Sequence, residues 1–478
     1  MNAILERMAG LGLAPKRLVS DSRQVQAGDT FIAYKGEAAD GRDFIAQAIQ
    51  NGAASVVWDD MGFNWPLNSK TPHFAVTGLR EKVGEIASAF YGEPSESLWV
   101  IGITGTNGKT SCSHWLAQAL HHLQRKTAVI GTLGNGFPEQ LSHAINTTPD
   151  PIVLQRSLAD YLAAGANSIA MEVSSHALVQ GRVNGIKFDV AVLTNLSRDH
   201  LDFHGDMDAY AAAKRMLFTW PRLQTAVLNA DDAFGAALAN ALDKTKVLTY
   251  GFQQADVRGS NLTLSDAGLS MTVTTAQGQA KLQANVLGRF NAYNLLAVLA
   301  ALLASDVSLK DAVATLSHVK SVAGRMQTLG GGDLPLVVVD YAHTPDALEK
   351  VLSTLREQCS GQLICVFGCG GNRDQGKRPL MGKVASSLAD FTIVTSDNPR
   401  HEDPQSIIAQ VLEGIQGQHS VEVDRAEAIQ QAIKMANSGD IVLLAGKGHE
   451  DTQQIGDAKR PFNDTLIASN ALKARIKI

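Results

Sequence analysis

The stretch Gly105-Thr106-Asn107-Gly108-Lys109-Thr110 lies between an apolar run, residues 99–104, and a segment with helical periodicity. Apolar side chains after the loop recur at helical spacing on one face: Cys112, Trp115, Leu116, Ala119, Leu120 and Leu123. A strand, a glycine-rich turn and a helix in this order place backbone N–H groups and the positive end of a helix dipole where phosphate binds. Lys109 would reach the β- and γ-phosphates, and the Thr110 hydroxyl would offer an oxygen to Mg²⁺.

The glycine spacing of this loop differs from the usual pattern. The common phosphate-binding loop, G-x-x-x-x-G-K-[ST], would place a glycine at Ile103, whereas this chain has Gly102 and Gly105. Because a Gly-Lys-Thr tripeptide alone recurs by chance, the prediction depends on the strand before it and the helix after it. On that context we predict that the chain binds ATP or GTP here.

The composition is that of a folded enzyme with several domains. The chain has 478 residues, 45% hydrophobic and 19% charged, which is too long for one hydrophobic core. Its formal net charge of −5 argues against a protein that coats nucleic acid. No apolar run approaches the roughly 20 residues that cross a bilayer, and the N-terminus lacks a signal-peptide pattern. We therefore expect a cytoplasmic enzyme without a membrane span.

The cysteines predict neither a disulfide framework nor a zinc site. The chain has four, at Cys112, Cys359, Cys365 and Cys369. Four are too few for a disulfide scaffold at this length. Cys365 and Cys369 have no second pair of zinc ligands, so we interpret them as buried reduced thiols.

The alternation of strand-like and helix-like segments predicts three α/β domains in series. Residues 1–95 form a small α/β domain that ends at a Glu93-Pro94-Ser95 linker. Residues 96–328 form a central P-loop domain of the ATPase type with a parallel sheet, and within it residues 257–287 read as an antiparallel hairpin. Gly330-Gly331-Gly332 marks a second boundary, so residues 329–478 form a C-terminal Rossmann-like α/β domain.

Two side chains at the ends of predicted strands are candidates for binding Mg²⁺. Glu172 ends one strand, and His200 lies in a polar segment after the next strand. The alternatives are a surface carboxylate for Glu172 and a transition-metal pair of His200 with His204, four residues away. For His204 alone we favour a structural role, and Lys214 reads as an ordinary exposed helix lysine.

Polar residues in the predicted C-terminal domain are suited to binding an amino acid. Gly368-Cys369-Gly370-Gly371-Asn372-Arg373 fails as a dinucleotide fingerprint, because the third glycine would fall at Arg373. Arg373 and Arg400 could each pair with a carboxylate, and Glu450 could hold an ammonium group. Together they fit a zwitterionic amino acid, and salt bridges between neighbouring loops are the alternative.

Several motifs in the same order resemble the Mur ligases, which add amino acids to the UDP-muramoyl peptide of bacterial cell-wall synthesis. In the central and C-terminal regions the motifs are Gly105 to Thr110, Met171-Glu172-Val173-Ser174-Ser175-His176, Asn195-Leu196-Ser197-Arg198-Asp199-His200-Leu201-Asp202, Phe290-Asn291-Ala292-Tyr293-Asn294 and Asp340-Tyr341-Ala342-His343-Thr344-Pro345. In the first domain Asp21-Ser22-Arg23 and Ala39-Asp40-Gly41-Arg42 also fit. The resemblance covers essentially the whole chain, and the displaced P-loop glycine is the family's own pattern.

The resemblance implies an ATP-dependent ligase that forms an amide through an acyl phosphate. Asp397-Asn398-Pro399-Arg400 resembles the signature of members that add meso-diaminopimelate to the D-Glu γ-carboxylate of UDP-MurNAc-L-Ala-D-Glu. Lysine-adding members lack this arginine, which can pair with the extra carboxylate of meso-diaminopimelate. The implied role is peptidoglycan precursor synthesis, and through it cell shape and division. A lysine-adding or folylpolyglutamate-type ligase, and a P-loop switch or motor without ligation, are the alternatives.

The resemblance also implies roles for single residues. Diaminopimelate would contact Arg373, Asp397, Asn398, Arg400, Gly446 and Glu450. The muramoyl peptide would contact Ser22, Thr147, Thr148, Ser174, Gln180 and Arg182. ATP would contact the P-loop residues Gly105, Thr106, Asn107, Gly108, Lys109 and Thr110 together with Asn291, Asn294, Arg325, Asp340 and His343. Catalysis would depend on Lys109, Glu172, His200 and Lys214, and Mg²⁺ would bind Thr110, Glu172, His200 and Lys214.

Two further expectations follow from the resemblance. Lys214 would carry a carbamate, as N6-carboxylysine, which replaces its interpretation as an exposed lysine. The third domain would close on the second to assemble the site and exclude water. We expect the chain to act as a monomer.

Overall fold

A computed structural model describes residues 3–37, 39–65, 70–265 and 267–476. The chain forms two compact units. The first comprises Met1–Tyr250 and Ala300–Val307, and the second comprises Gly251–Leu299 and Ser308–Ile478. Each unit has its own hydrophobic clusters. Within the described ranges, no helix combines the length and the apolar character needed to cross a membrane.

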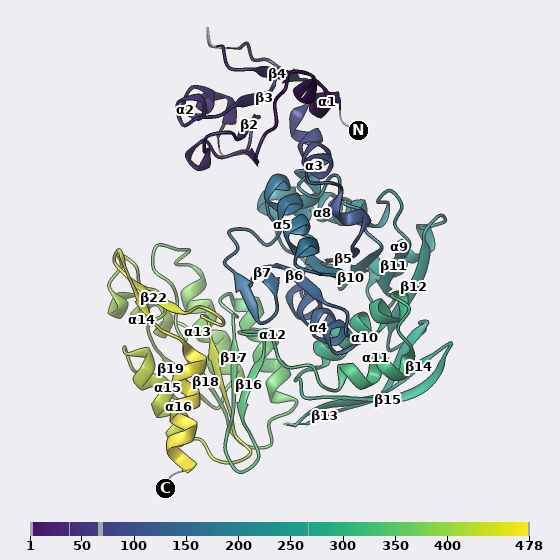
Figure 1. The fold of residues 1–478 in the computed structure, drawn as a ribbon. Helices are drawn as coiled ribbons and strands as arrows, with labels where there is room; N and C mark the ends of the chain where they lie inside the picture. The colour runs from purple at the N-terminus through teal and green to yellow at the C-terminus, as the bar shows by residue number, and fades with distance from the viewer. Residues whose placement is uncertain (1–2, 38, 66–69, 266, 477–478) are drawn as a thin grey trace. The chain divides into compact units, whose positions relative to one another are not determined.

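The N-terminal part of the first unit is a small parallel sheet with helices. Its strands, in spatial order, are β1 (Leu18–Val19), β2 (Thr30–Ala33), β3 (Ser55–Asp59) and β4 (His73–Val76). The helices are α1 (Ala3–Gly10), α2 (Ile45–Gln50) and α3 (Leu79–Phe90), and Figure 1 draws this region in purple. Glu93-Pro94-Ser95, predicted as a linker, overlaps a single 3₁₀ turn, Pro94–Glu96.

The central sheet of the first unit contains the predicted phosphate-binding strand. Its strands lie in the order β12-β11-β10-β5-β9-β6-β7-β8, parallel from β12 to β6 and antiparallel beyond. The bounds are β5 (Trp99–Thr104), β6 (Thr127–Gly131), β7 (Gly134–Phe137), β8 (Gln140–Ser142), β9 (Ser168–Glu172), β10 (Val190–Leu193), β11 (Thr225–Asn229) and β12 (Lys246–Gly251). The bounds of β5 match the prediction from sequence.

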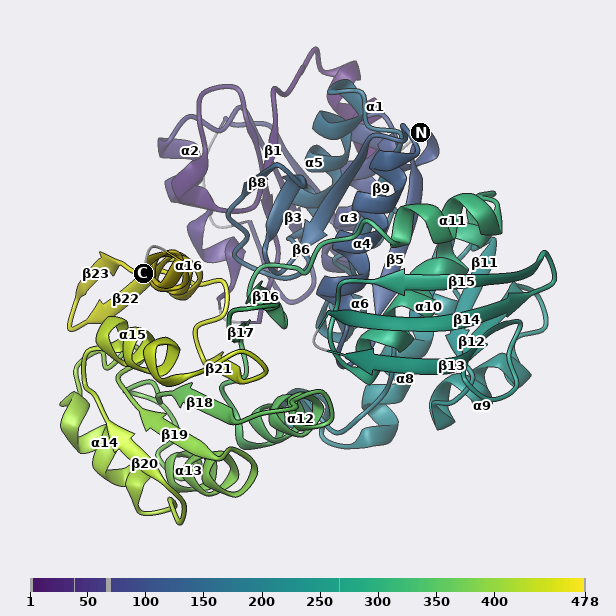
Figure 2. The same cartoon turned by 90° about the horizontal axis from the view of Figure 1, so that it is seen from below.

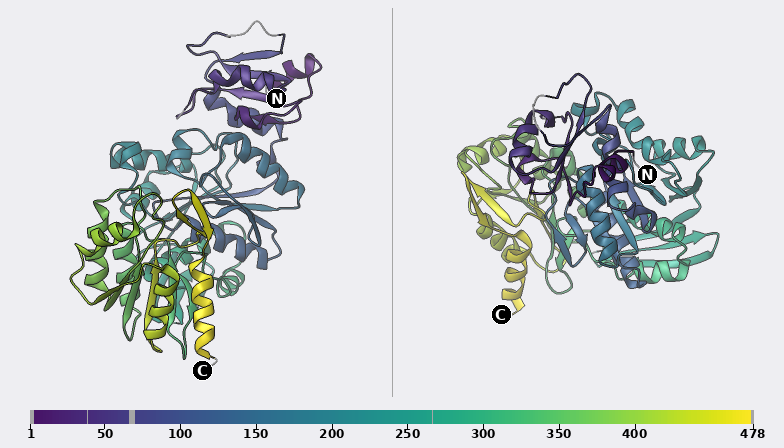
Figure 3. Two further views of the ribbon diagram at one scale, coloured as in Figure 1. Left: turned by 90° about the vertical axis from the view of Figure 1, so that its left-hand side faces the viewer. Right: turned by 45° about the horizontal axis from the view of Figure 1, so that its top comes forward.

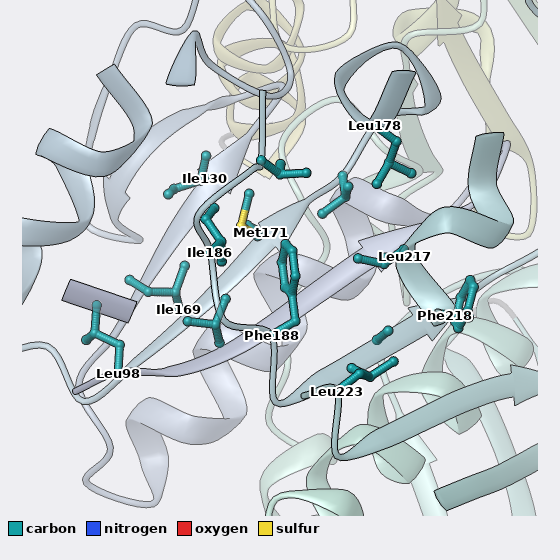
Figure 4. Close-up of a cluster of buried hydrophobic side chains, with 14 of the residues drawn as sticks. Leu98, Ile130, Ile169, Met171, Leu178, Ile186, Phe188, Leu217, Phe218 and Leu223 are labelled. Atoms are coloured by element: carbon teal, nitrogen blue, oxygen red, sulfur yellow. The ribbon is translucent and has the colours of Figure 1, made fainter. Parts of the chain in front are cut away.

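Helices connect these strands and complete a buried core. They are α4 (Lys109–His122), α5 (Pro151–Ala163), α6 (Ser175–Val179), α7 (Leu201–His204), α8 (Met207–Phe218) and α9 (Ala233–Ala241). Figure 4 shows side chains of the core, among them Ile169 and Met171 of β9, Phe188, and Leu217 of α8. Such runs of buried apolar residues are typical of parallel strands covered on both faces.

The second unit begins with an antiparallel meander. Strands β13 (Val257–Ser265), β14 (Gly268–Thr275) and β15 (Gly278–Ala284) lie side by side in Figure 2. The predicted hairpin is therefore present and continues into a third strand. Asp266, within the segment predicted as this hairpin, lies outside the described residues. Helices α10 (Arg289–Ala304) and α11 (Leu309–Leu316) follow in sequence.

A second parallel sheet forms the C-terminal part of this unit. Its order is β16-β17-β21-β18-β19-β20, with only β16 antiparallel to its neighbour. The bounds are β16 (Gln327–Gly330), β17 (Leu336–Asp340), β18 (Leu363–Phe367), β19 (Phe391–Val394), β20 (His419–Val421) and β21 (Ile441–Ala445). The glycines 330–332 lie at the turn between β16 and β17, and the predicted division after residue 328 falls inside β16, so the boundary itself stays a prediction.

Helices and a small hairpin complete the second unit. The helices are α12 (Pro345–Arg356), α13 (Lys377–Leu388), α14 (Pro404–Leu412), α15 (Arg425–Met435) and α16 (Asp464–Ile476), and the hairpin strands are β22 (Thr452–Ile455) and β23 (Ala458–Pro461). Figure 3 shows α16 leading to the C-terminus. The cysteines Cys365 and Cys369 are buried and free, as predicted.

Candidate functional site

The predicted phosphate-binding loop joins β5 to α4. Gly105 has φ of 145° and Gly108 has φ of 89°, conformations that side chains other than glycine rarely adopt. A Cβ at Gly105 would lie 1.9 Å from Thr194 Oγ1, so no larger residue fits there. Lys109 is the first residue of α4 and donates hydrogen bonds from Nζ to the carbonyl oxygens of Gly105, at 2.7 Å, and Thr106, at 2.9 Å.

The segment after β10 holds the loop in shape. Asn195 accepts from the backbone N–H of Thr106 at its carbonyl oxygen, at 2.9 Å, and from that of Asn107 at Oδ1, at 3.0 Å. Thr106 Oγ1 donates to the Ser197 carbonyl at 3.1 Å. Because β5 and β10 are parallel neighbours, their carboxyl ends bring these two loops together.

Glu172 ends β9 and is fully buried, so its interpretation as a surface carboxylate is wrong. Thr110 Oγ1 donates to Oε2 at 3.1 Å, the Thr132 N–H donates to Oε1 at 2.8 Å, and Thr132 Oγ1 donates to Oε2 at 3.2 Å. Among the described residues, no Lys, Arg or His forms a salt bridge with this carboxylate. A buried carboxylate held only by neutral groups, beside a threonine hydroxyl, fits a hard cation such as Mg²⁺.

His200 is the residue before α7 and has a left-handed backbone, with φ of 53°. Its imidazole is partly exposed, lies 3.5 Å from Asp199 Oδ2, and meets the His176 ring edge-on with 4.9 Å between ring centroids. His204 ends α7, and its Nε2 lies 2.9 Å from Ser175 Oγ, which agrees with a structural role. In the described part of the chain, no cluster of three or more His, Cys, Asp or Glu side chains is arranged to hold a metal ion.

Lys214 on α8 is buried, which corrects its interpretation from sequence as an exposed helix lysine. Its Nζ donates to the Gly105 carbonyl at 3.0 Å and lies 4.3 Å from the centroid of the Tyr210 ring. Burial, together with the positive charge of Lys109, lowers the pKa of Lys214 to about 6. Periodicity missed this burial, because the side chain points to the P-loop rather than to solvent.

Four of the six residues predicted to contact the muramoyl peptide lie beside Glu172. Thr148 Oγ1 donates to the Glu172 carbonyl at 2.9 Å and accepts from the Ser174 N–H at 3.1 Å. Arg182 Nη1 donates to the Thr148 carbonyl at 3.0 Å, and the Thr147 and Thr132 hydroxyl oxygens are 3.1 Å apart.

The other two lie at different places in the first unit. Gln180 is the residue after α6. Ser22 lies in the N-terminal region, where its hydroxyl donates to Gln47 Oε1 at 2.8 Å, and no contact between described residues links it directly to Glu172.

The residues predicted on the nucleotide side of the second unit lie near the ends of α10 and β17. Asn291 Nδ2 donates to the Leu287 carbonyl at 2.8 Å and accepts at Oδ1 from Asn294 Nδ2 at 2.9 Å. Asp340 ends β17, where it accepts from the N–H groups of Met326, at 2.8 Å, and Ala342, at 2.9 Å. Burial raises the pKa of Asp340.

Arg325 and His343 both contact Tyr341. The Arg325 guanidinium lies 5.3 Å from the centroid of the Tyr341 ring. A ring nitrogen of His343, Nδ1, lies 2.8 Å from the Tyr341 carbonyl oxygen. The structure therefore brings Arg325, Asp340 and His343 into one region of the second unit.

Glu450 and Asn398 form a hydrogen-bonded group with Lys447, which sequence reasoning did not single out. Lys447 is fully buried, and its Nζ lies 2.8 Å from Glu450 Oε2, 3.2 Å from Asn398 Oδ1 and 2.8 Å from the Thr452 carbonyl. Asn398 Nδ2 also donates to Glu450 Oε2 at 2.8 Å. The alternative of a salt bridge between neighbouring loop residues therefore applies to Glu450 Oε2, which pairs with Lys447. These contacts of the described residues do not involve Glu450 Oε1, which is therefore the oxygen that we assign to a ligand.

The two predicted arginines differ in their surroundings. Arg400 has φ of 51°, and its Nη1 donates to the Gly371 carbonyl at 2.7 Å. Arg373 is exposed and forms no salt bridge within the described ranges. A Cβ at Gly446, where φ is 113°, would lie 2.7 Å from Asp397 Oδ2, and burial raises the pKa of Asp397.

Sequence reasoning missed Thr132 and Lys447 for different reasons. Thr132 follows β6, a strand that was not predicted, although its position beside Glu172 depends on the pairing of β6 with β9. Lys447 lies in a quoted motif, Gly446-Lys447-Gly448-His449-Glu450, but no sequence pattern marks a lysine as buried.

Three family profiles match the chain. They describe the Mur ligase family catalytic domain at residues 16–91, the Mur ligase middle domain at 103–302 and the Mur ligase glutamate ligase domain at 324–448. Over 470 residues the chain is 54% identical to a Chromobacterium violaceum protein named UDP-N-acetylmuramoyl-L-alanyl-D-glutamate–2,6-diaminopimelate ligase, covering 97% of this chain and 95% of the relative. A Pseudomonas aeruginosa protein of the same name is 49% identical over 463 residues, with 96% and 95% coverage.

The chain is also similar to solved structures of Mur ligases. One titled as the structure of that same diaminopimelate ligase is 39% identical and has a TM-score of 0.75, covering 97% of this chain and 95% of its own. A MurF ligase from Thermotoga maritima in complex with ADP is 19% identical with a TM-score of 0.66, covering 99% of this chain and 100% of its own, and therefore shows the fold alone.

Proposed function

The chain belongs to the Mur ligase family, and from that premise we propose the reaction it catalyses. It is an ATP-dependent ligase that adds diaminopimelate to UDP-MurNAc-L-Ala-D-Glu in peptidoglycan precursor synthesis. The observation that carries this assignment is the agreement of relatives 48–54% identical over nearly the whole chain on one activity. The three-domain fold, with a central ATPase-like parallel sheet, is the family's fold.

The amide bond forms in two steps. A carboxylate is a poor acyl donor, so its oxygen first attacks the γ-phosphorus of ATP, which gives an acyl phosphate and releases ADP. The diaminopimelate amine then attacks the acyl carbon, and the tetrahedral intermediate expels phosphate while the nitrogen loses a proton. The acceptor carboxylate is the γ-carboxylate of D-Glu, and the donor is the meso isomer.

Residues of the first unit neutralise charge in the first step. The P-loop amides and Lys109 bind the phosphates. Thr110, Glu172, His200 and the carbamate of Lys214 would hold Mg²⁺, which when bound supplies positive charge against the phosphoryl oxygens. This assignment is supported by the buried carboxylate of Glu172, which accepts hydrogen bonds from neutral groups and forms no salt bridge among the described residues. Thr147, Thr148, Ser174 and Arg182 orient the muramoyl peptide beside it.

Lys214 is suited to carbamylation because its amine is buried with a pKa of about 6, so the neutral form dominates at pH 7. The neutral amine attacks CO₂, forming an N–C bond and releasing one proton, and the resulting carbamate is an anionic oxygen ligand. In nuclear magnetic resonance spectra recorded with isotope-labelled bicarbonate, a carbamate signal is expected in the wild type. Its presence in Lys214→Met as well would reject the assignment to this residue.

Residues of the second unit bind the amino acid. Arg400 pairs with the distal carboxylate of diaminopimelate, and Glu450 Oε1 accepts from an ammonium group. Asn398 and Asp397 shape the pocket, and Arg373 offers a second cation.

Asn291, Asn294, Arg325, Asp340 and His343 contribute to the ATP site. We place the reaction in the cytoplasm, where its nucleotide-linked substrates are made, and infer a monomer.

One assay distinguishes this function from its alternatives. Enzyme, ATP and UDP-MurNAc-L-Ala-D-Glu are incubated with equal diaminopimelate and lysine, and ADP, phosphate and both peptide products are quantified. We expect one ADP per diaminopimelate peptide and little lysine product. Preferential lysine incorporation would assign the chain to the lysine-adding branch, and ADP release without either co-substrate would favour a nucleotide switch.

A further inference from the structure

Thr132 lies between two residues that have different roles in the proposed function. Thr147 binds the muramoyl peptide, and Glu172 binds Mg²⁺. It directly follows β6, which pairs in parallel with β9 in a register that places Ile130 opposite Met171. One step further in this register, Gly131 lies opposite Glu172, and Thr132 is the next residue after Gly131, within hydrogen-bond reach of the Glu172 carboxylate. The register of the sheet, and not sequence proximity, therefore puts the two side chains together.

Thr132 holds both oxygens of the Glu172 carboxylate. Its backbone N–H donates to Oε1 at 2.8 Å, and its hydroxyl donates to Oε2 at 3.2 Å. The preceding residue leaves room for this contact, because a Cβ at Gly131 would lie 2.3 Å from Glu172 Oε1. A carboxylate fixed at both oxygens has lost its rotational freedom before any ligand binds.

The Thr132 hydroxyl also has a fixed direction. An ionised carboxylate only accepts hydrogen bonds, so the single proton of Thr132 Oγ1 points to Glu172. The contact between the Thr132 and Thr147 hydroxyl oxygens, at 3.1 Å, then has Thr147 as its donor. The result is a directed chain from Thr147 through Thr132 to Glu172, in which each bond polarises the next.

We propose that Thr132 is a positioning residue that couples muramoyl-peptide binding at Thr147 to the affinity of Glu172 for Mg²⁺. This inference rests on the proposed roles of Thr147 and Glu172. When a bound substrate accepts the hydrogen bond that Thr147 donates, Thr132 Oγ1 loses that donor. The hydrogen bond from Thr132 Oγ1 to the Glu172 carboxylate then changes in strength. Coupling between two ligands is reciprocal, so Mg²⁺ must change the affinity for the muramoyl peptide by the same factor.

The test measures binding rather than turnover. Isothermal titration calorimetry gives the Kd for Mg²⁺ with ADP present, without and with UDP-MurNAc-L-Ala-D-Glu, and the ratio of the two values is the coupling factor. We expect a coupling factor of roughly 5-fold or more in the wild type. Thr132→Val keeps the β-branched shape and the N–H but removes the hydroxyl. It should weaken Mg²⁺ binding about 10-fold or more and bring the coupling factor to about one.

Three further variants make the result specific. Thr132→Ser retains the hydroxyl and should restore both quantities to within about 3-fold of the wild type. Thr147→Val removes the donor while leaving the Thr132–Glu172 bonds, so it should lose the coupling and keep most of the Mg²⁺ affinity. Thr127→Val is the matched control, because its hydroxyl lies at the other end of β6, 3.1 Å from Ser168 Oγ, and it should behave as the wild type.

The outcomes separate this inference from the function on which it rests. Wild-type Mg²⁺ affinity and coupling in Thr132→Val overturn the inference, provided that Glu172→Gln weakens Mg²⁺ binding. Wild-type Mg²⁺ affinity in Glu172→Gln overturns the proposed metal site and the inference with it. If Thr132→Val fails to fold, shown by loss of its thermal transition, Thr147→Val decides, since retained coupling in that variant overturns the directed chain.

Discussion

At the scale of single residues, the proposed function assigns the choice of amino acid to Arg400. Its guanidinium presents a planar set of donors in a constrained, left-handed segment, and the Gly371 carbonyl holds one of its nitrogens at 2.7 Å. A lysine ammonium is a point charge and cannot replace the guanidinium in a two-bond contact with a carboxylate.

Arg400→Lys is therefore expected to raise the KM for meso-diaminopimelate by roughly 10- to 100-fold, because a charge-assisted contact is lost. The KM for ATP should stay the same. Steady-state kinetics with each substrate varied in turn measures both. Arg356→Lys, at a half-exposed salt bridge with Asp390, is the control and should match the wild type. An unchanged KM for meso-diaminopimelate in Arg400→Lys would remove the assignment of specificity to this residue.

Lys447 is buried and hydrogen-bonds to Glu450, a residue of the proposed amino-acid site. Lys447→Met would leave Glu450 Oε2 and Asn398 Oδ1 without the cation that now lies 2.8 Å and 3.2 Å from them. Removing one partner of a buried pair costs on the order of 3 kcal/mol, so urea unfolding of the second unit should begin at lower concentration. The KM for the amino acid should also rise.

Lys350→Met gives the matched surface comparison for Lys447. Lys350 pairs with Asp346 in an exposed i,i+4 contact at 2.7 Å, so its loss should cost less than about 1 kcal/mol. Equal destabilisation by the two substitutions would contradict the distinction between the buried and the exposed pair.

At the scale of elements, helix α4 packs against β6 and β9, and His114 is one of its buried residues. His114 Nε2 has no hydrogen-bond partner among the described residues, and burial lowers the pKa of His114 to about 4. The folded pKa lies below the unfolded value of about 6.5, so the unfolded chain binds the proton more tightly. Stability is therefore fully present above pH 6.5 and is lost as the pH falls from 6.5 towards 4.

His114→Leu should remove this acid sensitivity. The free energy of unfolding of the wild type should fall by on the order of 3 kcal/mol more than that of the variant between pH 7 and pH 4. Denaturant titrations at several pH values measure the difference. His121→Leu, at an exposed position of the same helix, should keep the wild-type pH dependence. A wild-type pH profile in His114→Leu would show that His114 is not the group responsible.

The elements that the sequence predicted well are those whose burial is continuous. The bounds of β5 match the predicted run, residues 99–104, since this strand is an apolar run enclosed on both faces. Strands β7 and β8 were not predicted, because they are short, rich in glycine or polar residues, and stabilised by pairing with each other. Local sequence carries little information about such strands.

At the scale of the whole molecule, the chain has separate hydrophobic clusters in its two compact units. Proteins with several cores seldom unfold in one step. We expect differential scanning calorimetry to give a total unfolding enthalpy larger than the van't Hoff enthalpy. Adding UDP-MurNAc-L-Ala-D-Glu should raise the Tm of only one transition, because a ligand stabilises the part that binds it. A single transition with equal enthalpies would contradict this prediction.

The sequence by itself determined the α/β class, the phosphate-binding loop between β5 and α4, and the family, because these depend on local order and on motifs of adjacent residues. It also placed Glu172 at the end of a strand, where ligands of open sheets bind. Only the tertiary structure decided that Glu172 and Lys214 are buried, that Thr132 joins Thr147 to Glu172, and that Lys447 forms an ion pair with Glu450. Most of these contacts join residues far apart in the chain, and in each case burial and pairing depend on how strands and helices pack, which no local pattern encodes.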